Sequence, residues 1–471
     1  MKNSAYSALP ISSSVELQSG SLNQLQQPPK KDLLEEEFAD DLPLIGAGDG
    51  FAATAAAGSG IPGAVFNLTT SVIGAGIMAL PAAMKVLGLL PGFLSIVFMG
   101  VLSEISIELL IRFAVLRKSP SYGDIVLSAL GRPFKIVSEI CIIVNNAGVL
   151  VVYLIIIGDV MSGSAKHVGV LDQLFGNVDW DQRKLVILVV LLVFLAPLCA
   201  LEKIDSLSLT SGASVALAVV FVIVSCIIAL VKLAEGRITT PRMWPDFRSK
   251  AAILDLLVVV PIMTNAYVCH FNIQPIYNEL KGRTPKKMYM VSRITTVLCV
   301  VVYASTAISG YLLFGDDTES DVLTNFDKDL GIQFSSILNY VVRIGYVLHL
   351  ILVFPVIHFS LRQTVDSLVF TTSSAGSRKR MFALTAVLLI VIYLGSTMIP
   401  SIWVAFKFTG ATTGMSLGFI FPALIALRLD KQEKNLKLRE KYISWLMLVL
   451  AVIAGILGLV GNIYSLQNSS D

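Results

Sequence analysis

The sequence predicts an all-α membrane protein with eleven transmembrane helices. Of the 471 residues, 55% are hydrophobic and only 15% are charged, and the mean hydropathy is +0.76. A soluble domain usually carries about 25% charged residues, and a single core could not bury this much apolar surface. Charge-poor runs of about 20 residues, enough to cross a hydrocarbon layer of about 30 Å, recur along the chain. The net charge of +3 is small and dispersed, which argues against a nucleic-acid-binding protein.

Each predicted span is a charge-poor run bounded by polar or turn-forming residues. In chain order, the spans are residues 63–88, 91–116, 136–161, 184–201, 206–232, 252–279, 287–314, 334–359, 380–398, 401–427 and 442–464. The ninth and tenth spans are separated only by the residues around Pro400, and a proline there predicts a tight turn. Residues 1–60 are predicted to form a disordered cytosolic tail and residues 61–430 a ten-helix transporter core. Residues 431–471 would add a cytosolic linker, the eleventh helix and a short non-cytosolic tail.

The distribution of lysine and arginine predicts that the N-terminus is cytosolic. With this orientation, the loops after even-numbered helices face the cytosol, where positive charge gathers in membrane proteins. Those loops hold Arg117, Lys118, Arg132, Lys135, Lys281, Arg283, Lys286, Lys287, Arg378, Lys379, Arg380, Lys431, Lys434, Lys437, Arg439 and Lys441. The opposite loops hold fewer, and residues 316–329 are acidic. The basic loop at 237–250 is an exception to the rule.

The cysteines and histidines show no spacing typical of a metal site or a disulfide framework. The cysteines lie in apolar segments without a CxxC motif, as expected for small packing residues. The HExxH motif is also absent from the sequence. We therefore expect no cofactor, no metal site and no enzymatic activity.

The first span contains a sequence that favours a break at mid-membrane. Gly74, Ala75 and Gly76 follow a stretch at 67–71 that is rich in hydroxyl and amide side chains. Unwinding there leaves free N–H groups at the positive end of the second half-helix, where a carboxylate can bind. Small residues also let membrane helices approach closely, so a packing face is the alternative interpretation. The residues alone leave both interpretations open.

A second break is predicted in the sixth span. The second half of this span is unusually polar for a membrane helix, with Pro261, Thr264, Asn265, Tyr267, His270, Asn272, Gln274 and Pro275. Polar residues at membrane depth are costly unless they face water, a substrate or another helix. The first and sixth spans hold the same place in two successive groups of five. This arrangement is typical of an inverted five-plus-five repeat with paired broken helices around a midplane site.

The sequence resembles the amino acid/auxin permease family. The similar segments are Phe66–Pro81 (FNLTTSVIGAGIMALP), Ser121–Asp124 (SYGD), Cys269–Asn272 (CHFN), Tyr277–Leu280 (YNEL) and Gly310–Gly315 (GYLLFG). Within the family, the chain is most similar to the plant and fungal vacuolar amino-acid transporters, which are related to the animal sodium-coupled neutral amino-acid transporters. The resemblance implies a LeuT-like fold of eleven helices. It also implies that the substrate binds between the unwound parts of helices one and six.

These observations together give a candidate substrate site. The predicted substrate-binding residues are Thr70, Ser71, Gly74, Ala75, Gly76, Ile77, Asn265 and Tyr267. N–H groups of the first break would hold the α-carboxylate of an amino acid. Carbonyl groups of both breaks, with Asn265 and Tyr267, would hold its ammonium group.

Proton coupling or facilitated export is favoured over sodium coupling. In the sodium-coupled branch of the family, an asparagine stands where this chain has Thr70, and a hydroxyl residue stands where it has the aliphatic segment 351–353. Because sodium needs several oxygen ligands, these changes weaken a sodium site. His270 and His349 are candidates for proton coupling because histidine titrates near neutral pH. Neutral, hydrogen-bonded histidines are the alternative.

Glu104 is expected to pair with Arg343 or Lys407 across the bundle.

The expected function is secondary active transport of amino acids, in the form of proton-coupled movement between vacuole and cytosol. Asp40, Leu44 and Ile45 fit an acidic dileucine pattern, which addresses proteins to endosomal or vacuolar membranes, although such short patterns also arise by chance. The expected partners are an amino-acid substrate, a co-transported proton and the lipid bilayer. Two alternatives stay open: a non-transporting amino-acid sensor, and a sodium-coupled transporter of the plasma membrane.

Overall fold

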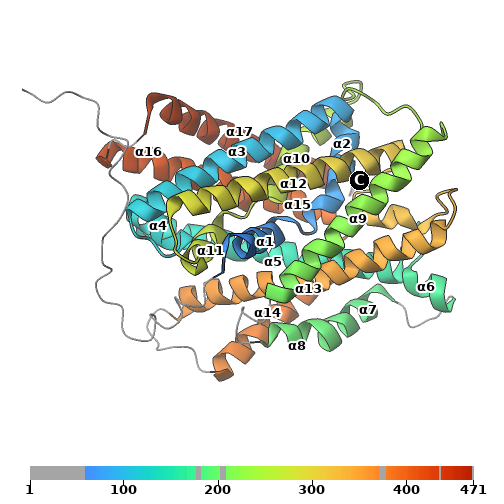
Figure 1. The fold of residues 1–471 in the computed structure, drawn as a ribbon, viewed down its shortest axis with the longest axis horizontal. Coiled ribbons are helices and arrows are strands. Elements are labelled where there is room, and N and C mark those ends of the chain that lie inside the picture. Colours follow the sequence, from blue (N-terminus) through green and yellow to red (C-terminus); the bar gives the residue numbers. More distant parts are fainter. Residues whose placement is uncertain are drawn as a thin grey trace, which may run out of the picture. The chain divides into compact units, whose positions relative to one another are not determined.

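The computed structural model describes residues 59–164, 166–176, 182–201, 208–370, 378–433 and 436–468. Apart from two isolated β-bridges, the regular structure in these ranges is helical, so the predicted all-α fold is confirmed (Figure 1). The predicted sorting motif lies outside the described ranges. The α-helices are α1 (Ile61–Val72), α2 (Gly76–Leu87), α3 (Leu89–Leu116), α4 (Tyr122–Leu130), α5 (Arg132–Ser162), α6 (Val170–Phe175), α7 (Arg183–Val190), α8 (Ala196–Cys199), α9 (Ser208–Ala234), α10 (Lys250–Tyr267), α11 (Ile273–Glu279), α12 (Pro285–Phe314), α13 (Ser335–Val369), α14 (Arg378–Met398), α15 (Ile402–Thr409), α16 (Phe421–Glu433) and α17 (Leu438–Asn468).

Most of the predicted spans are present as long apolar helices. Within the described ranges, nine helices are long and apolar enough to cross a membrane, and α1 with α2 makes a tenth span that bends by 57°. The predicted span at 184–201 is helical from Arg183 to Cys199, through α7, the π-helical turn η2 (Leu191–Leu195) and α8. This stretch is about 26 Å long by the rise of an α-helix, slightly less than the hydrocarbon thickness. The count of eleven and the inverted repeat therefore stay predictions.

Local sequence determines where several helices begin. The hydroxyl of Ser401 accepts a hydrogen bond from the amide of Val404 at 3.4 Å and starts α15, so the turn predicted at Pro400 is confirmed. Thr284 caps α12 in the same way, with its hydroxyl 3.3 Å from the amide nitrogen of Lys287. Such side chains satisfy N–H groups that the first turn of a helix leaves without a partner.

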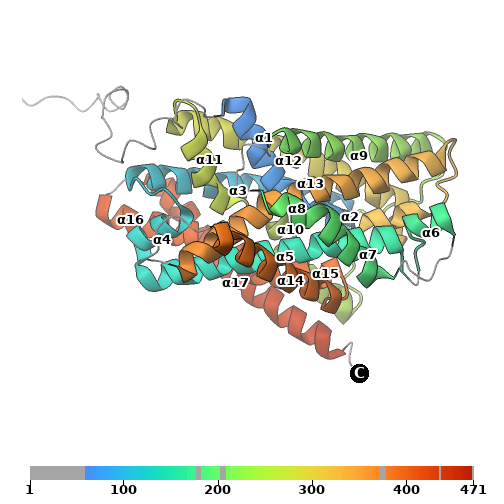
Figure 2. The same cartoon turned by 90° about the horizontal axis from the view of Figure 1, so that it is seen from below.

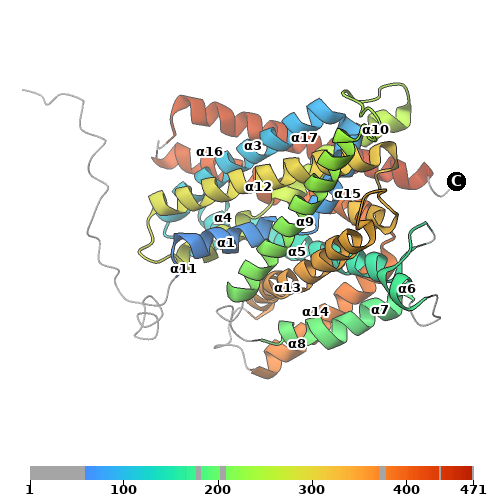
Figure 3. The ribbon, with the colours of Figure 1, turned by 45° about the vertical axis from the view of Figure 1, so that its right-hand side comes forward.

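Two continuous helices, α12 and α13, pack against the first broken helix. α12 packs against α1, α2, α3 and α9, and α13 packs against α5 and α9. Figure 1 shows α12 beside α3, and Figure 2 shows α1 close to α11. α17 lies along one flank of this group, and α7, α8 and α14 lie along the other (Figure 3). The interrupted helices are therefore held among uninterrupted neighbours.

One end of the bundle joins the start of α1 to the end of α11, and we call it the α11 end. Here the amide of Ser59 donates to the carbonyl of Glu279 at 3.0 Å, and the amide of Lys281 donates to the carbonyl of Ser59 at 3.0 Å. This short parallel bridge links the first half of helix one to the second half of helix six. Backbone hydrogen bonds therefore join the two half-helices at this end.

The opposite end contains the 3₁₀-helical segment η6 (Val322–Asp327), and we call it the η6 end. Arg343 of α13 is buried there, and its guanidinium donates to the carbonyls of Val160 at 2.9 Å and Val168 at 2.7 Å. Asp321, which precedes η6, is also buried, and burial raises its pKa to about 8. Burial therefore favours the protonated carboxyl, which avoids the cost of a buried charge.

The predicted pairing of Glu104 with Arg343 or Lys407 is wrong. Glu104 on α3 instead accepts hydrogen bonds from the hydroxyls of Ser292 and Thr296 on α12, each at 2.7 Å. Arg343 binds carbonyl groups at the η6 end, and Lys407 lies near the ring of Trp403. Two hydroxyl donors on the neighbouring helix satisfy the carboxyl group, so it needs no cation from across the bundle.

Candidate functional site

The predicted break in helix one is confirmed. α1 ends at Val72 and α2 begins at Gly76, and Ile73 between them has an extended backbone with a ψ angle of 104°. A Cβ atom on Gly74 would overlap the hydroxyl of Tyr153. A Cβ atom on Gly76 would lie 3.0 Å from Cα of Ala266, closer than real Cβ atoms normally come. The two glycines thus permit Tyr153 of α5 and Ala266 of α10 to approach the first break closely.

The sixth span is broken at the same level. α10 ends at Tyr267, Val268 is extended with a ψ angle of 107°, and a 3₁₀ turn η4 (His270–Asn272) leads into α11. Asn265, one turn before the break, is 8% exposed. Neither its amide nitrogen nor its amide oxygen has a hydrogen-bond partner among the described residues. A buried amide without a partner is costly, so Asn265 is suited to bind a polar ligand.

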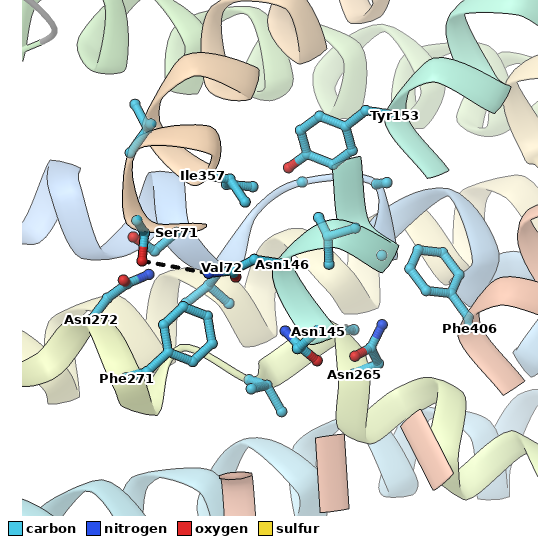
Figure 4. Close-up of a pocket in the computed structure, with 18 residues that line it drawn as sticks. Ser71, Val72, Asn145, Asn146, Tyr153, Asn265, Phe271, Asn272, Ile357 and Phe406 are labelled. Atoms are coloured by element: carbon cyan, nitrogen blue, oxygen red, sulfur yellow. Dashed lines mark hydrogen bonds between the residues drawn. The ribbon is translucent and has the colours of Figure 1, made fainter. Parts of the chain in front are cut away.

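A cavity of about 40 Å³ lies between the two breaks. Figure 4 shows the side chains of Asn145, Asn146, Asn265 and Asn272 around it. The described lining residues include no acidic or basic side chain; they are Ser71, Val72, Gly74, Ala75, Gly76, Asn145, Asn146, Val149, Tyr153, Asn265, Ala266, Val268, Phe271, Asn272, Val356, Ile357, Ser360 and Phe406. The wall therefore offers amides, hydroxyls and backbone groups rather than full charges.

The backbone at the cavity has opposite polarity on its two sides. Ala75 and Gly76 stand at the N-terminus of α2, where the positive end of the helix dipole favours a negative group. Val72 and Ala266 stand at the C-terminal ends of α1 and α10, where the negative end of the helix dipole favours a positive group. A small zwitterion can satisfy both sides at once. This chemistry matches the carboxylate and ammonium of an amino acid.

Five of the predicted substrate-binding residues line the cavity: Ser71, Gly74, Ala75, Gly76 and Asn265. The other three, which are Thr70, Ile77 and Tyr267, are not among the lining residues. The hydroxyl of Thr70 donates to the carbonyl of Phe66 at 2.9 Å and lies 3.5 Å from the carbonyl of Ser211 on α9. The roles of the predicted residues in substrate binding stay predictions.

Sequence reasoning missed several residues of the cavity wall. The cavity wall also includes Asn145 and Asn146 on α5, Tyr153 about two helical turns further along α5, and Ser360 on α13. The adjacent asparagines stand in an otherwise apolar span, and this polar pair at membrane depth would have indicated a functional position. Tyr153 and Ser360 carry no comparable local pattern.

The two candidate histidines have different surroundings. His349 on α13 is fully buried, and its Nδ1 lies 2.7 Å from the carbonyl oxygen of Ser214 on α9. A carbonyl can only accept, so Nδ1 carries the hydrogen and Nε2 is the free base. The ring of His349 packs 4.8 Å from the ring of Tyr346, whose hydroxyl donates to the carbonyl of Gly74 at 2.8 Å. His349 is therefore linked to the first break through a single side chain.

His270 lies at the second break but is not among the residues that line the cavity. It is 1% exposed, and neither ring nitrogen has a hydrogen-bond partner among the described residues. Its ring is 6.3 Å from that of Phe419 in an edge-to-face arrangement. These contacts are those of a packed aromatic ring.

Comparison with known proteins adds the family context. A family model described as "Transmembrane amino acid transporter protein" matches residues 57–464. "Amino acid transporter AVT6E" of Arabidopsis thaliana is 70% identical over 416 residues, which cover 88% of this chain and 85% of that protein. "Amino acid transporter AVT6A" of the same plant is 46% identical over 415 residues, 87% of this chain and 89% of that protein. The crystal structure of MhsT in complex with L-phenylalanine has a similar fold, with a TM-score of 0.54 at 14% identity, covering 85% of this chain and 98% of MhsT.

Proposed function

The chain belongs to the transmembrane amino acid transporter family, and from this premise we propose that it moves amino acids across an endomembrane together with protons. It is a multi-pass membrane transporter and not an enzyme. The observation that carries the proposal is the cavity between the two breaks, where backbone groups of opposite polarity face the same small space.

The substrate would lie with its two charged groups on opposite sides of the cavity. Its carboxylate would bind at the N-terminus of α2, near Ala75 and Gly76, and its ammonium group at the carbonyls of Val72 and Ala266. The unpaired amide of Asn265 would add a hydrogen bond to the substrate. Such placement at the ends of broken helices is a common way for transporters to hold charge inside a membrane.

Protons are the proposed coupling ion, and His349 is the proposed carrier. Its free Nε2 can take a proton, and its contact with Tyr346 connects it to the carbonyl of Gly74. A positive charge on the ring would disturb this contact and bias the position of the first break. Thr70 supports the preference over sodium, because its hydroxyl is directed to backbone carbonyls of Phe66 and Ser211.

The proposed location rests on the sequence. The acidic dileucine pattern formed by Asp40, Leu44 and Ile45 agrees with the vacuolar branch that the family segments resemble. An endomembrane also supplies the proton gradient that a coupled transporter needs, because vacuoles are acidic inside.

Flux measurements on the purified full-length chain test this function. In proteoliposomes supplied in turn with each of the twenty radiolabelled amino acids, we expect at least one to cross about tenfold faster than in protein-free liposomes. An imposed pH gradient should drive its accumulation. No protein-dependent flux of any amino acid would reject transport, and accumulation driven by a sodium gradient but not by a pH gradient would reject proton coupling.

A further inference from the structure

Tyr303 contacts both breaks, although it belongs to neither broken helix. It stands in the middle of α12 and is fully buried. Its hydroxyl oxygen lies 2.7 Å from the carbonyl oxygen of Val72 and 2.7 Å from the carbonyl oxygen of Ala266. One side chain therefore meets the end of α1 and the end of α10 at the same time.

These two carbonyls are the kind that a helix leaves without a partner. Val72 is the last residue of α1 and Ala266 is the last but one of α10, and the last four carbonyls of a helix have no acceptor role inside it. Both residues also line the cavity. Two carbonyl dipoles that point toward one place repel each other unless a donor lies between them, and the phenolic hydrogen of Tyr303 is that donor.

The ring of Tyr303 is held firmly enough to position its hydroxyl. It packs edge-to-face on the ring of Tyr267, with 5.0 Å between the ring centroids and an angle of 72°. Tyr267 in turn donates its hydroxyl to the carbonyl of Ile96 on α3 at 3.1 Å. The ring of Tyr303 is thus held by Tyr267 at the end of α10, and Tyr267 is itself anchored to α3.

We propose that Tyr303 is a positioning residue that sets the separation of the Val72 and Ala266 carbonyls, so that both reach the ammonium group of the substrate. A phenol donates one hydrogen, whereas each carbonyl oxygen has two lone pairs. Acceptor capacity therefore remains on both carbonyls for the three N–H donors of an ammonium group. This inference rests on the proposed transport function, because it assigns the geometry of the same site.

Substitution by phenylalanine tests this role with little change in packing. Tyr303→Phe keeps the ring on Tyr267 and removes only the shared donor. We expect the KM for the amino acid with the largest wild-type flux to rise about tenfold, while the maximal rate changes less than about threefold. The matched control is Tyr311→Phe on the same helix, since the hydroxyl of buried Tyr311 accepts from the amide of Arg242 at 3.0 Å, away from the cavity.

A second substitution covers the case in which Tyr303→Phe does not fold. Introducing p-aminophenylalanine at position 303 restores N–H donors at the same place, and we expect its KM to lie within about threefold of wild type. The proposal is overturned if Tyr303→Phe keeps the wild-type KM, if Tyr311→Phe raises KM equally, or if the p-amino variant folds with a KM about tenfold higher. Absence of any wild-type flux would instead reject the transport function, and the proposal would fall with it.

Discussion

Replacing Gly76 with alanine is expected to lower amino-acid transport by about tenfold to a hundredfold. The new Cβ atom would lie 3.0 Å from Cα and 3.1 Å from Cβ of Ala266, so the two breaks would have to separate. Overpacking of this kind costs about 1–3 kcal/mol, and each ~1.4 kcal/mol corresponds to a factor of ten. Initial flux at low substrate concentration in proteoliposomes measures the effect.

Two other glycines serve as matched controls for this substitution. A Cβ atom on Gly212 of α9 or on Gly345 of α13 would meet nothing within 4 Å among the described residues. Gly212→Ala and Gly345→Ala should therefore keep the wild-type flux. The amount of folded protein recovered by size-exclusion chromatography separates a lost site from lost packing. Full flux in Gly76→Ala, or a loss explained entirely by lower recovery, would count against a substrate site at the breaks.

Replacing His349 with glutamine is expected to abolish accumulation driven by a pH gradient. The glutamine amide can still donate to the carbonyl of Ser214, but it cannot take a proton near neutral pH. A gradient of one pH unit stores about 1.4 kcal/mol per proton, which is about tenfold accumulation if one proton moves with each amino acid. We expect about tenfold accumulation by the wild type and none by His349→Gln.

Exchange without a gradient provides the internal control for this variant. His349→Gln should still exchange labelled for unlabelled amino acid, because the cavity lining is unchanged. His358→Gln is the matched control and should keep gradient-driven accumulation. His358 is another fully buried histidine of α13. Gradient-driven accumulation that survives in His349→Gln, or that is lost in His270→Gln instead, would show that the proton is carried elsewhere.

The sequence was sufficient to predict the helices because hydropathy and helix breaking are local properties. The span predicted at 91–116 is α3 from Leu89 to Leu116, and the glycines at 74 and 76 flank the observed break. The span at 334–359 was placed too short, since α13 continues to Val369 as a more polar helix beyond the apolar run. A charge-poor window detects the part of a helix that lies in lipid and not its full length.

The partners of individual side chains were harder to predict, because they depend on contacts between distant segments. Glu104 finds its donors on α12, nearly two hundred residues away, and Tyr303 joins two breaks that no local pattern connects to it. Thr70 and Ser71 are neighbours in sequence, yet only Ser71 lines the cavity. Successive helical residues point about 100° apart, so an error of one position changes the face.

Cryo-electron microscopy of the full-length protein, with a saturating concentration of the best-transported amino acid, tests most directly whether the two breaks form the substrate site. We expect new density between the first turn of α2 at Ala75 and Gly76 and the carbonyls of Val72 and Ala266. Density for the amino acid at another place, or none between the breaks in a sample that transports it, would contradict this assignment.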